Sequence, residues 1–322
     1  MIKKIRLTIV LSIGVGVGVI LFSLSSCKNI SAKKTTEVEA PAYKISLAQW
    51  SINKMIREDA VSPYEFASLA SKWGFEGLEY VSQLYTDVTK SDDPDAAIKL
   101  FVQKNNELSA KFGLKNILIM VDEEGNLATQ NEEERLITIE NHKKWINAAA
   151  AMDCHSIRIN LFGESDPELW KSYSKLSLIA LSEYALPLNV NIIVENHGYL
   201  SSNAALLMTL MNEVNMKNCG TLPDFGNFCL KREENELWDA PCIESYDNYK
   251  GVAEMMPKAF AVSAKSYDFD GEGNETTLDY QRLISIVKSN GYDQYIGIEY
   301  EGSRLSEEEG ILATRDLLLK LM

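Results

Sequence analysis

Three carboxylates in the sequence each stand at the end of an apolar, β-rich run: Glu195 in NIIVEN (191–196), Asp224 in CGTLPDF (219–225) and Glu299 in YIGIEYE (295–301). Burying a carboxylate costs free energy unless a cation or a hydrogen-bond donor accompanies it. Carboxylates gathered in one place also raise one another's pKa values when no cation lies among them. The three residues therefore predict a site that holds a divalent cation and moves protons.

Further polar side chains end neighbouring apolar runs. Ser263 and Lys265 lie in FAVSAKS (260–266), and His197 follows Glu195 by two residues, so the two side chains share a face if the strand continues. Gly297 precedes Glu299 by two residues and leaves room below that acid. We expect Lys265 to take part in catalysis and Ser263 and His197 to contact the substrate.

A second group of candidates lies in the first half of the chain. Arg158 and Asn160 share one face of SIRINLF (156–162), and Glu79 lies in GLEYV (77–81). We expect all three to contact a polar substrate. Trp50 follows the first apolar run and suits either core packing or stacking against a sugar ring.

The elements that position these residues alternate between short apolar runs and longer amphipathic segments. Besides the six runs above, the strand candidates are KISLAQW (44–50) and LKNILIMV (114–121). Eight strands that alternate with helices predict an α/β fold, a single-domain (β/α)8 TIM barrel, whose reacting groups lie at the carboxyl ends of the strands. A doubly wound sheet is the alternative, but no G-x-G-x-x-G follows the first strand.

The first 27 residues predict a lipoprotein signal peptide. Lys3, Lys4 and Arg6 precede an apolar run that ends in LSSC, so we expect lipidation of Cys27 and a location in the bacterial cell envelope, periplasmic or at the outer membrane. An uncleaved membrane anchor is the alternative. Residues 28–43 predict a flexible tether, and residues 44–322 a catalytic domain.

Composition excludes some partners. The net charge is −14, and removal of the signal peptide makes it −17, which argues against binding to nucleic acid. Apart from Cys27, the cysteines match no zinc pattern, and we expect most of them to be buried, although an oxidising compartment permits a disulfide. These cysteines are Cys154, Cys219, Cys229 and Cys242. His142 and His155 suit structural positions.

With these residues in view, the chain resembles the xylose isomerase-like TIM barrel superfamily, in its sugar phosphate isomerase/epimerase branch. The segments that carry the resemblance are VENHG (194–198), PDFGNF (223–228), VSAKSYDFD (262–270) and YIGIEYEG (295–302). The resemblance implies that Glu195, Asp224 and Glu299 bind a divalent metal, Mn, Mg, Co or Zn. It also implies that the two glutamates exchange a proton with a carbon next to a sugar carbonyl.

One departure puts the metal in question. The family has a metal-binding histidine where this chain has Ser263, so His197, Asp268 or water would complete the site, or Lys265 would act on the carbonyl oxygen instead. No arginine cluster or glycine-rich phosphate loop follows the last strands. We therefore expect a non-phosphorylated carbohydrate as the substrate.

Three functions remain open from the sequence. The first is a sugar isomerase or epimerase, and the second is a lyase or hydratase of a keto-sugar, such as a 3-keto-glycoside, which starts with the same proton abstraction. The third is a non-catalytic glycan-binding lipoprotein with Trp50, Tyr80 and Tyr85 as stacking surfaces. DNA-repair endonucleases also occur in the superfamily, but the acidic composition argues against that activity.

Overall fold

The computed structural model describes residues 43–238 and 240–322. The predicted signal peptide with Cys27, and all of the predicted tether except Tyr43, lie outside the described residues. Among the described residues, no helix combines the length and the apolar character that a bilayer span requires. Tyr43 itself packs in the hydrophobic core.

Eight parallel strands form one sheet, in the order β6-β5-β4-β3-β2-β1-β10-β9. The strands are β1 (Lys44–Ala48), β2 (Gly77–Val81), β3 (Lys115–Met120), β4 (Ser156–Ile159), β5 (Asn191–Glu195), β6 (Cys219–Leu222), β9 (Val262–Ser266) and β10 (Tyr295–Tyr300). Each lies within one of the predicted runs. The α/β barrel prediction is confirmed.

The two ends of this sheet meet between β6 and β9. Isolated parallel bridges join Thr221 to Ala259 and Asp224 to Ser263. The Ser263 amide donates to the Pro223 carbonyl at 3.0 Å, and the Phe225 amide donates to the Ser263 carbonyl at 3.1 Å. The barrel is therefore closed at two of the predicted site residues, Asp224 and Ser263.

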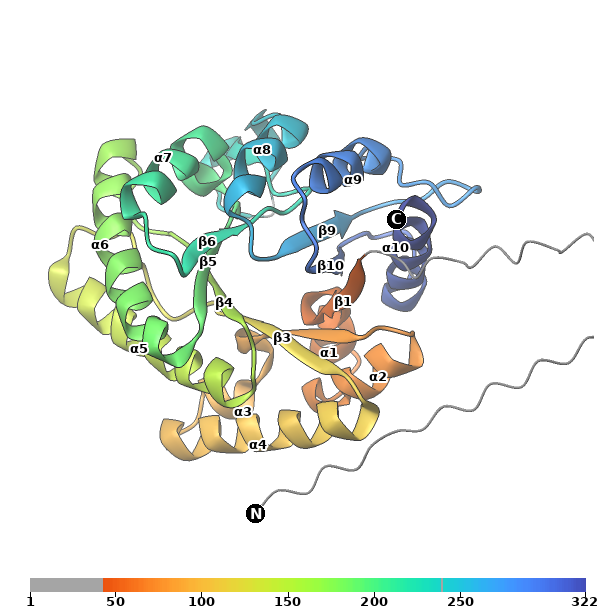
Figure 1. Ribbon diagram of the computed structural model, residues 1–322, viewed down its shortest axis with the longest axis horizontal. Helices are drawn as coiled ribbons and strands as arrows, with labels where there is room; N and C mark the ends of the chain where they lie inside the picture. Colours follow the sequence, from red (N-terminus) through yellow and green to blue (C-terminus); the bar gives the residue numbers. More distant parts are fainter. Residues whose placement is uncertain (1–42, 239) are drawn as a thin grey trace, which may run out of the picture. The chain divides into compact units, whose positions relative to one another are not determined.

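Helices surround the strands (Figure 1). They are α1 (Asn53–Arg57), α2 (Phe66–Lys72), α3 (Thr86–Thr89), α4 (Pro94–Phe112), α5 (Glu132–Ala151), α6 (Pro167–Ala185), α7 (Ala204–Val214), α8 (Asn248–Met255), α9 (Tyr280–Ser289) and α10 (Glu307–Leu321). Local sequence explains their ends: the Asp279 side chain accepts from the Arg282 amide at the start of α9, and Gly291 adopts a positive φ after its end.

The hydrophobic core has two layers. The larger cluster fills the space between the strands and the helices and includes Trp145 and Trp170, both fully buried. The smaller cluster includes Ile193, Leu118 and Met120. Side chains alternate along a strand, so Glu195 shares the face of Ile193 and emerges just above this smaller cluster.

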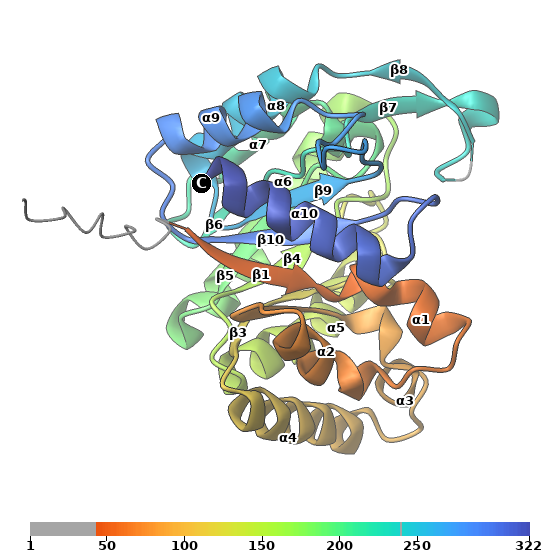
Figure 2. The same ribbon diagram turned by 90° about the vertical axis from the view of Figure 1, so that its right-hand side faces the viewer.

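An antiparallel hairpin was not predicted. It consists of β7 (Cys229–Arg232) and β8 (Cys242–Ser245), lies between β6 and α8, and is cross-linked by a Cys229–Cys242 disulfide. Figure 2 shows it on the side of the molecule where the arrows of β1 and β9 end. The expectation that most cysteines are buried holds for Cys154 and Cys219 only.

Candidate active site at the carboxyl ends of the strands

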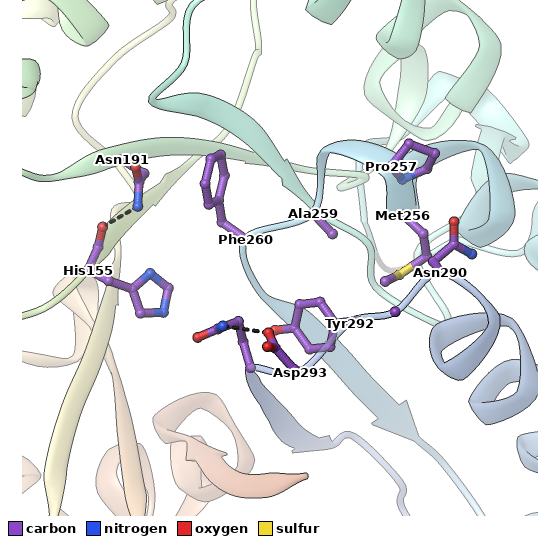
Figure 3. Close-up of a pocket in the computed structure, with 11 residues that line it drawn as sticks. His155, Asn191, Met256, Pro257, Ala259, Phe260, Asn290, Tyr292 and Asp293 are labelled. Carbon is purple, nitrogen blue, oxygen red and sulfur yellow. Dashed lines mark hydrogen bonds between the residues drawn. The ribbon is translucent and has the colours of Figure 1, made fainter. Parts of the chain in front are cut away.

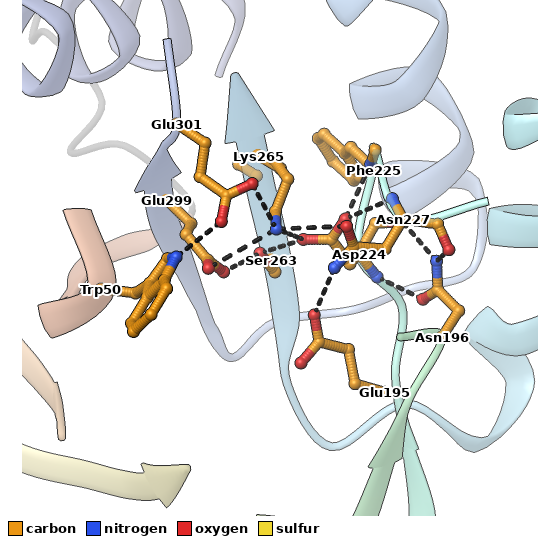
Figure 4. A network of polar contacts seen from close by, with 12 residues as sticks. Trp50, Glu195, Asn196, Asp224, Phe225, Asn227, Ser263, Lys265, Glu299 and Glu301 are labelled. Carbon is orange, nitrogen blue, oxygen red and sulfur yellow. Dashed lines mark hydrogen bonds and ion pairs between the residues drawn. The ribbon is translucent and has the colours of Figure 1, made fainter. Parts of the chain in front are cut away.

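The three predicted carboxylates converge at one point. Glu195 ends β5, Asp224 follows β6 and Glu299 lies in β10, and one oxygen from each lies within 4.8 Å of the others. Their exposed fractions are 2%, 0% and 5%, respectively. Groups far apart in the sequence thus form one buried acidic triad, as the strand-end pattern predicts (Figure 4).

Ser263 and Lys265 connect two members of this triad. The Ser263 hydroxyl lies 2.6 Å from an Asp224 oxygen and 3.1 Å from a Glu299 oxygen. The Lys265 ammonium lies 3.5 Å from Glu299 and 3.9 Å from Asp224. Strand register explains this arrangement, because Lys265 pairs with Glu299 between β9 and β10. A serine and a buried cation thus lie where the resemblance places a metal-binding histidine.

Arg158 holds the other side of the triad. Its guanidinium makes ion pairs with Glu195 at 2.9 Å and with Asp122 at 2.7 Å, and all three residues are buried. The Asn160 side chain also donates to Asp122 at 2.6 Å. Arg158 and Asn160 share a face, as predicted, but the partner that joins them is Asp122, which the sequence analysis missed.

Glu301 extends the cluster outward. It lies 3.1 Å from the Lys265 ammonium and accepts a hydrogen bond of 2.6 Å from the Trp50 indole. The Arg57 guanidinium covers the Trp50 ring at 4.6 Å. Trp50 therefore orients a carboxylate, and Glu301 is a further site residue that the sequence analysis missed.

Two asparagines support the acids. Asn227 donates to Glu195 at 2.9 Å and accepts from Lys265 at 3.3 Å. Asn196 donates to the Asp224 carbonyl at 3.0 Å and accepts from the Asp224 amide at 2.8 Å. The ENH and DFGN segments thus hold each other in place after β5 and β6.

His197 lies beside two other aromatic rings. Its ring centroid is 4.8 Å from that of Trp238 and 6.1 Å from that of Phe162. Its Nδ1 is buried and has no hydrogen-bond partner among the described residues. His197 follows β5 and comes two residues after Glu195, so it lies on the same rim of the barrel as the triad.

Glu79 lies deeper in the barrel than the triad. Its carboxylate accepts from the Ser46 hydroxyl at 2.5 Å and is 1% exposed. A Cβ at Gly297 would clash with the Glu79 carboxylate. The space that this glycine was predicted to leave below Glu299 is therefore occupied by Glu79.

Comparison with known proteins agrees with this fold. Residues 67–321 match the family described as xylose isomerase-like TIM barrel. The chain belongs to this family. The resemblance that the sequence segments indicate is therefore confirmed at the level of the family.

Solved structures share the fold of this xylose isomerase-like barrel. The 3-keto-D-glucoside 4-epimerase from E. coli has a TM-score of 0.65 at 14% identity, with coverage of 86% of this chain and 99% of that one. A D-tagatose 3-epimerase-like protein has a TM-score of 0.63 at 15% identity, covering 86% and 96%. A xylose isomerase-like barrel from Mycobacterium smegmatis, solved with magnesium, has a TM-score of 0.58 at 15% identity, covering 87% and 96%.

One curated relative matches locally. The C-glycoside deglycosidase alpha subunit of Arthrobacter globiformis is 37% identical over 54 residues. The match spans 17% of this chain and 15% of that protein.

The environment of the triad shifts the pKa values of its members upward. Burial raises the pKa of Glu299 to about 8, against the opposing effect of Lys265. Burial also raises the pKa of Asp224 to about 6 and raises that of Glu195, where Arg158 opposes the shift. For Lys265, burial lowers the pKa, but Asp224, Glu299 and Glu301 outweigh it and the net shift is upward. Burial thus favours the protonated form of Glu299 near neutral pH in the metal-free protein, and the neighbouring carboxylates favour the charged form of Lys265.

The donor set of this xylose isomerase-like barrel fits a divalent cation. Three buried carboxylates offer oxygens within 4.8 Å of one another, and the Ser263 hydroxyl lies between two of them. The charged groups around this point are Asp122, Glu195, Asp224, Glu299 and Glu301 against Arg158 and Lys265. Carboxylates outnumber cations, so the cluster can hold a divalent metal, and an all-oxygen set suits Mg²⁺ or Mn²⁺.

A cavity of about 420 Å³ lies at the opposite end of the strands (Figure 3). His155, which precedes β4, and Asn191, which begins β5, line it together with Phe260. His155 bonds to the Ser156 hydroxyl at 2.6 Å, and His142 bonds to the Thr138 carbonyl at 2.7 Å within α5. These contacts agree with the structural positions expected for both histidines.

Proposed function

We propose that the protein is a sugar isomerase or epimerase that moves a proton at a carbon next to the carbonyl of a non-phosphorylated sugar. The observation that carries this proposal is a pair of buried glutamates in one triad with different surroundings. Glu195 lies against Arg158, whereas Glu299 lies against Ser263 and Lys265. Different surroundings give two carboxyl groups different pKa values, so one group suits the role of the base and the other that of the acid.

In this mechanism the Glu195 carboxylate takes a proton from the carbon beside the carbonyl. Glu299, which starts protonated, returns a proton to the sugar, and the two carboxyl groups thereby exchange their protonation states. The Lys265 ammonium offsets the negative charge that develops on the carbonyl oxygen. In their ionised forms, Glu195, Asp224 and Glu299 would hold a divalent ion, which would supply polarisation of the sugar oxygens in place of the proton on Glu299.

Positioning side chains keep these groups in place. Arg158 fixes the Glu195 carboxylate through its ion pair, and Trp50 fixes Glu301, which in turn contacts Lys265. We assign substrate contacts to His197 and Asn160, beside the aromatic rings and Asp122. Glu79 lies below the triad, where it would act on the substrate only through the groups above it.

The substrate class follows from charge. The two cations of the cluster already pair with carboxylates, so no free cation of the cluster remains for a phosphate group. The chain as a whole carries −14. The 3-keto-D-glucoside 4-epimerase and the D-tagatose 3-epimerase-like protein described above have names that refer to sugars without phosphate, which agrees with a neutral substrate.

We also propose that the protein works in the cell envelope, anchored by lipid on Cys27. The disulfide Cys229–Cys242 supports this location, because such cross-links persist in oxidising compartments.

A second candidate is elimination or hydration of a keto-sugar, which shares the first proton abstraction. The local match to the C-glycoside deglycosidase alpha subunit supports this second candidate. The products separate the two, because elimination creates a carbon–carbon double bond whereas epimerisation conserves the sugar formula.

The test is proton exchange in D₂O, followed by NMR on a panel of ketoses and keto-glycosides, with and without chelator. We expect deuterium to enter the carbon beside the carbonyl. Glu195→Gln should slow this exchange by about 10²- to 10⁴-fold, while Glu183→Gln, an exposed change on α6, should leave it unaltered. Sugar binding by Glu195→Gln, measured by calorimetry, should persist. Binding without exchange in the wild-type protein would instead favour a glycan-binding lipoprotein.

A further inference from the structure

The hairpin β7–β8 carries an aromatic side chain toward the candidate site. Trp238 is 37% exposed, and its ring lies 4.8 Å from the His197 ring and 6.2 Å from the Phe162 ring. Phe162 and His197 follow β4 and β5, whose ends carry Arg158 and Glu195. The three rings thus form an aromatic patch that adjoins the acid cluster and remains partly open to solvent.

Several contacts hold Trp238 in place. The Cys229–Cys242 disulfide joins the two strands of the hairpin, and the Arg232 guanidinium donates to the Ala240 carbonyl at 2.7 Å. The Tyr199 hydroxyl, from the segment after β5, donates to the carbonyls of Asn235 and Glu236 at 2.7 and 2.9 Å. A platform fixed before binding loses little conformational entropy when a ligand arrives.

Two details suit this patch to a ligand that is both apolar and polar. The His197 side chain is half-buried beside Trp238, and an imidazole ring offers a nitrogen to a hydroxyl group. Gly198 lies beneath Trp238, since a Cβ there would approach the indole at 3.5 Å. A sugar presents an apolar ring face and hydroxyl groups at its edge, which matches an indole beside an imidazole.

We propose that Trp238 and His197 form an outer subsite that binds the second ring of a glycoside, beyond the sugar that reacts at the triad. This inference rests on the proposed function and names its substrate class. The substrate is then a glycoside, not a free monosaccharide.

A glycoside substrate constrains the chemistry. Its anomeric carbon is an acetal and cannot open to a carbonyl, so the carbonyl beside the abstracted proton must lie on another ring carbon. The outer subsite therefore assigns to this protein a keto-glycoside, which an oxidation of a ring hydroxyl must supply.

The test compares two probes that share a reacting ring, 3-keto-D-glucose and phenyl 3-keto-β-D-glucoside, by calorimetry. We expect the wild-type protein to bind the phenyl glycoside more tightly. Trp238→Ala should weaken binding of the phenyl glycoside by about 2- to 12-fold, which is the loss expected for one aromatic contact. The same change should alter the affinity for the free sugar by less than about twofold. Trp238→Phe should keep most of the difference. Ile243→Ala, an exposed change on β8, is the matched control.

Equal weakening of both probes in Trp238→Ala, or an unchanged ratio of their affinities, overturns the outer subsite. A wild-type protein that does not bind the phenyl glycoside also overturns it. Failure of the proposed function would give a different result. No deuterium would then enter the reacting ring, whatever the effect of Trp238→Ala on binding.

Discussion

Replacement of Lys265 by methionine should destabilise the protein strongly. The ammonium is 1% exposed and lies 3.1, 3.5 and 3.9 Å from carboxylates of Glu301, Glu299 and Asp224. At an effective dielectric of 20, each contact with an ionised carboxylate is worth about 4 to 5 kcal/mol before desolvation. Burial of the ammonium offsets much of this gain, and loss of one partner from a buried ionic cluster typically costs about 3 to 5 kcal/mol. That range corresponds to a fall in Tm of about 10 °C.

The assay is urea unfolding and calorimetry of chelator-treated protein at pH 7. Lys99→Met, an exposed change on α4, is the matched control and should alter the free energy of unfolding by less than about 0.5 kcal/mol. Combining Lys265→Met with Glu301→Gln should recover part of the loss, because Glu301 is the carboxylate nearest to the ammonium, at 3.1 Å, and would be left without its cation. Saturating Mn²⁺ should also recover part of it. A Lys265→Met protein within 1 kcal/mol of wild type would refute the view that this ammonium compensates the acids.

Two further predictions concern pH and redox state. Glu299 has a folded-state pKa of about 8 against 4.5 unfolded, so the folded protein binds this proton more tightly and stability should fall as pH rises from about 4.5 to 8. Chelator-treated Glu299→Gln should show a flatter profile in urea unfolding at pH 5 and pH 8, and an equal slope in both proteins would contradict the assignment. Reduction of the Cys229–Cys242 disulfide, which closes a short loop, should lower the free energy of unfolding by up to about 3 kcal/mol. Cys154→Ala, which removes a free cysteine, is the control and should respond to the reductant as the wild-type protein does. No change in the thermal transition on reduction would contradict it.

The barrel and its triad were predictable because their signals are periodic. Each strand of the sheet is an apolar run, and Glu195, Asp224 and Glu299 interrupt such runs at the end where barrels carry their sites. Asp122 had the same signal, since it follows the buried segment Ile119–Val121, and it could have been found by the same rule. Glu301 stands two residues beyond Glu299 on the same face.

Other features leave no such signal. The strands β7 and β8 are four residues each, partly charged and largely exposed, so no alternation of apolar residues marks them. The pairing of Cys229 with Cys242 depends on that hairpin, and spacing alone cannot choose among the cysteines. The position of Trp238 against His197 depends on the same fold of the hairpin and could not be derived from either residue.

The hairpin also bears on how this protein could change over evolutionary time. It leaves the barrel after Phe228 and returns at Tyr246, and the Tyr246 amide donates to the Phe228 carbonyl at 2.8 Å. The insertion is therefore closed at its base, independently of its length. Lengthening such a segment costs little loop entropy, so natural variation there can retune which molecules are accepted while the acids of the barrel stay unchanged.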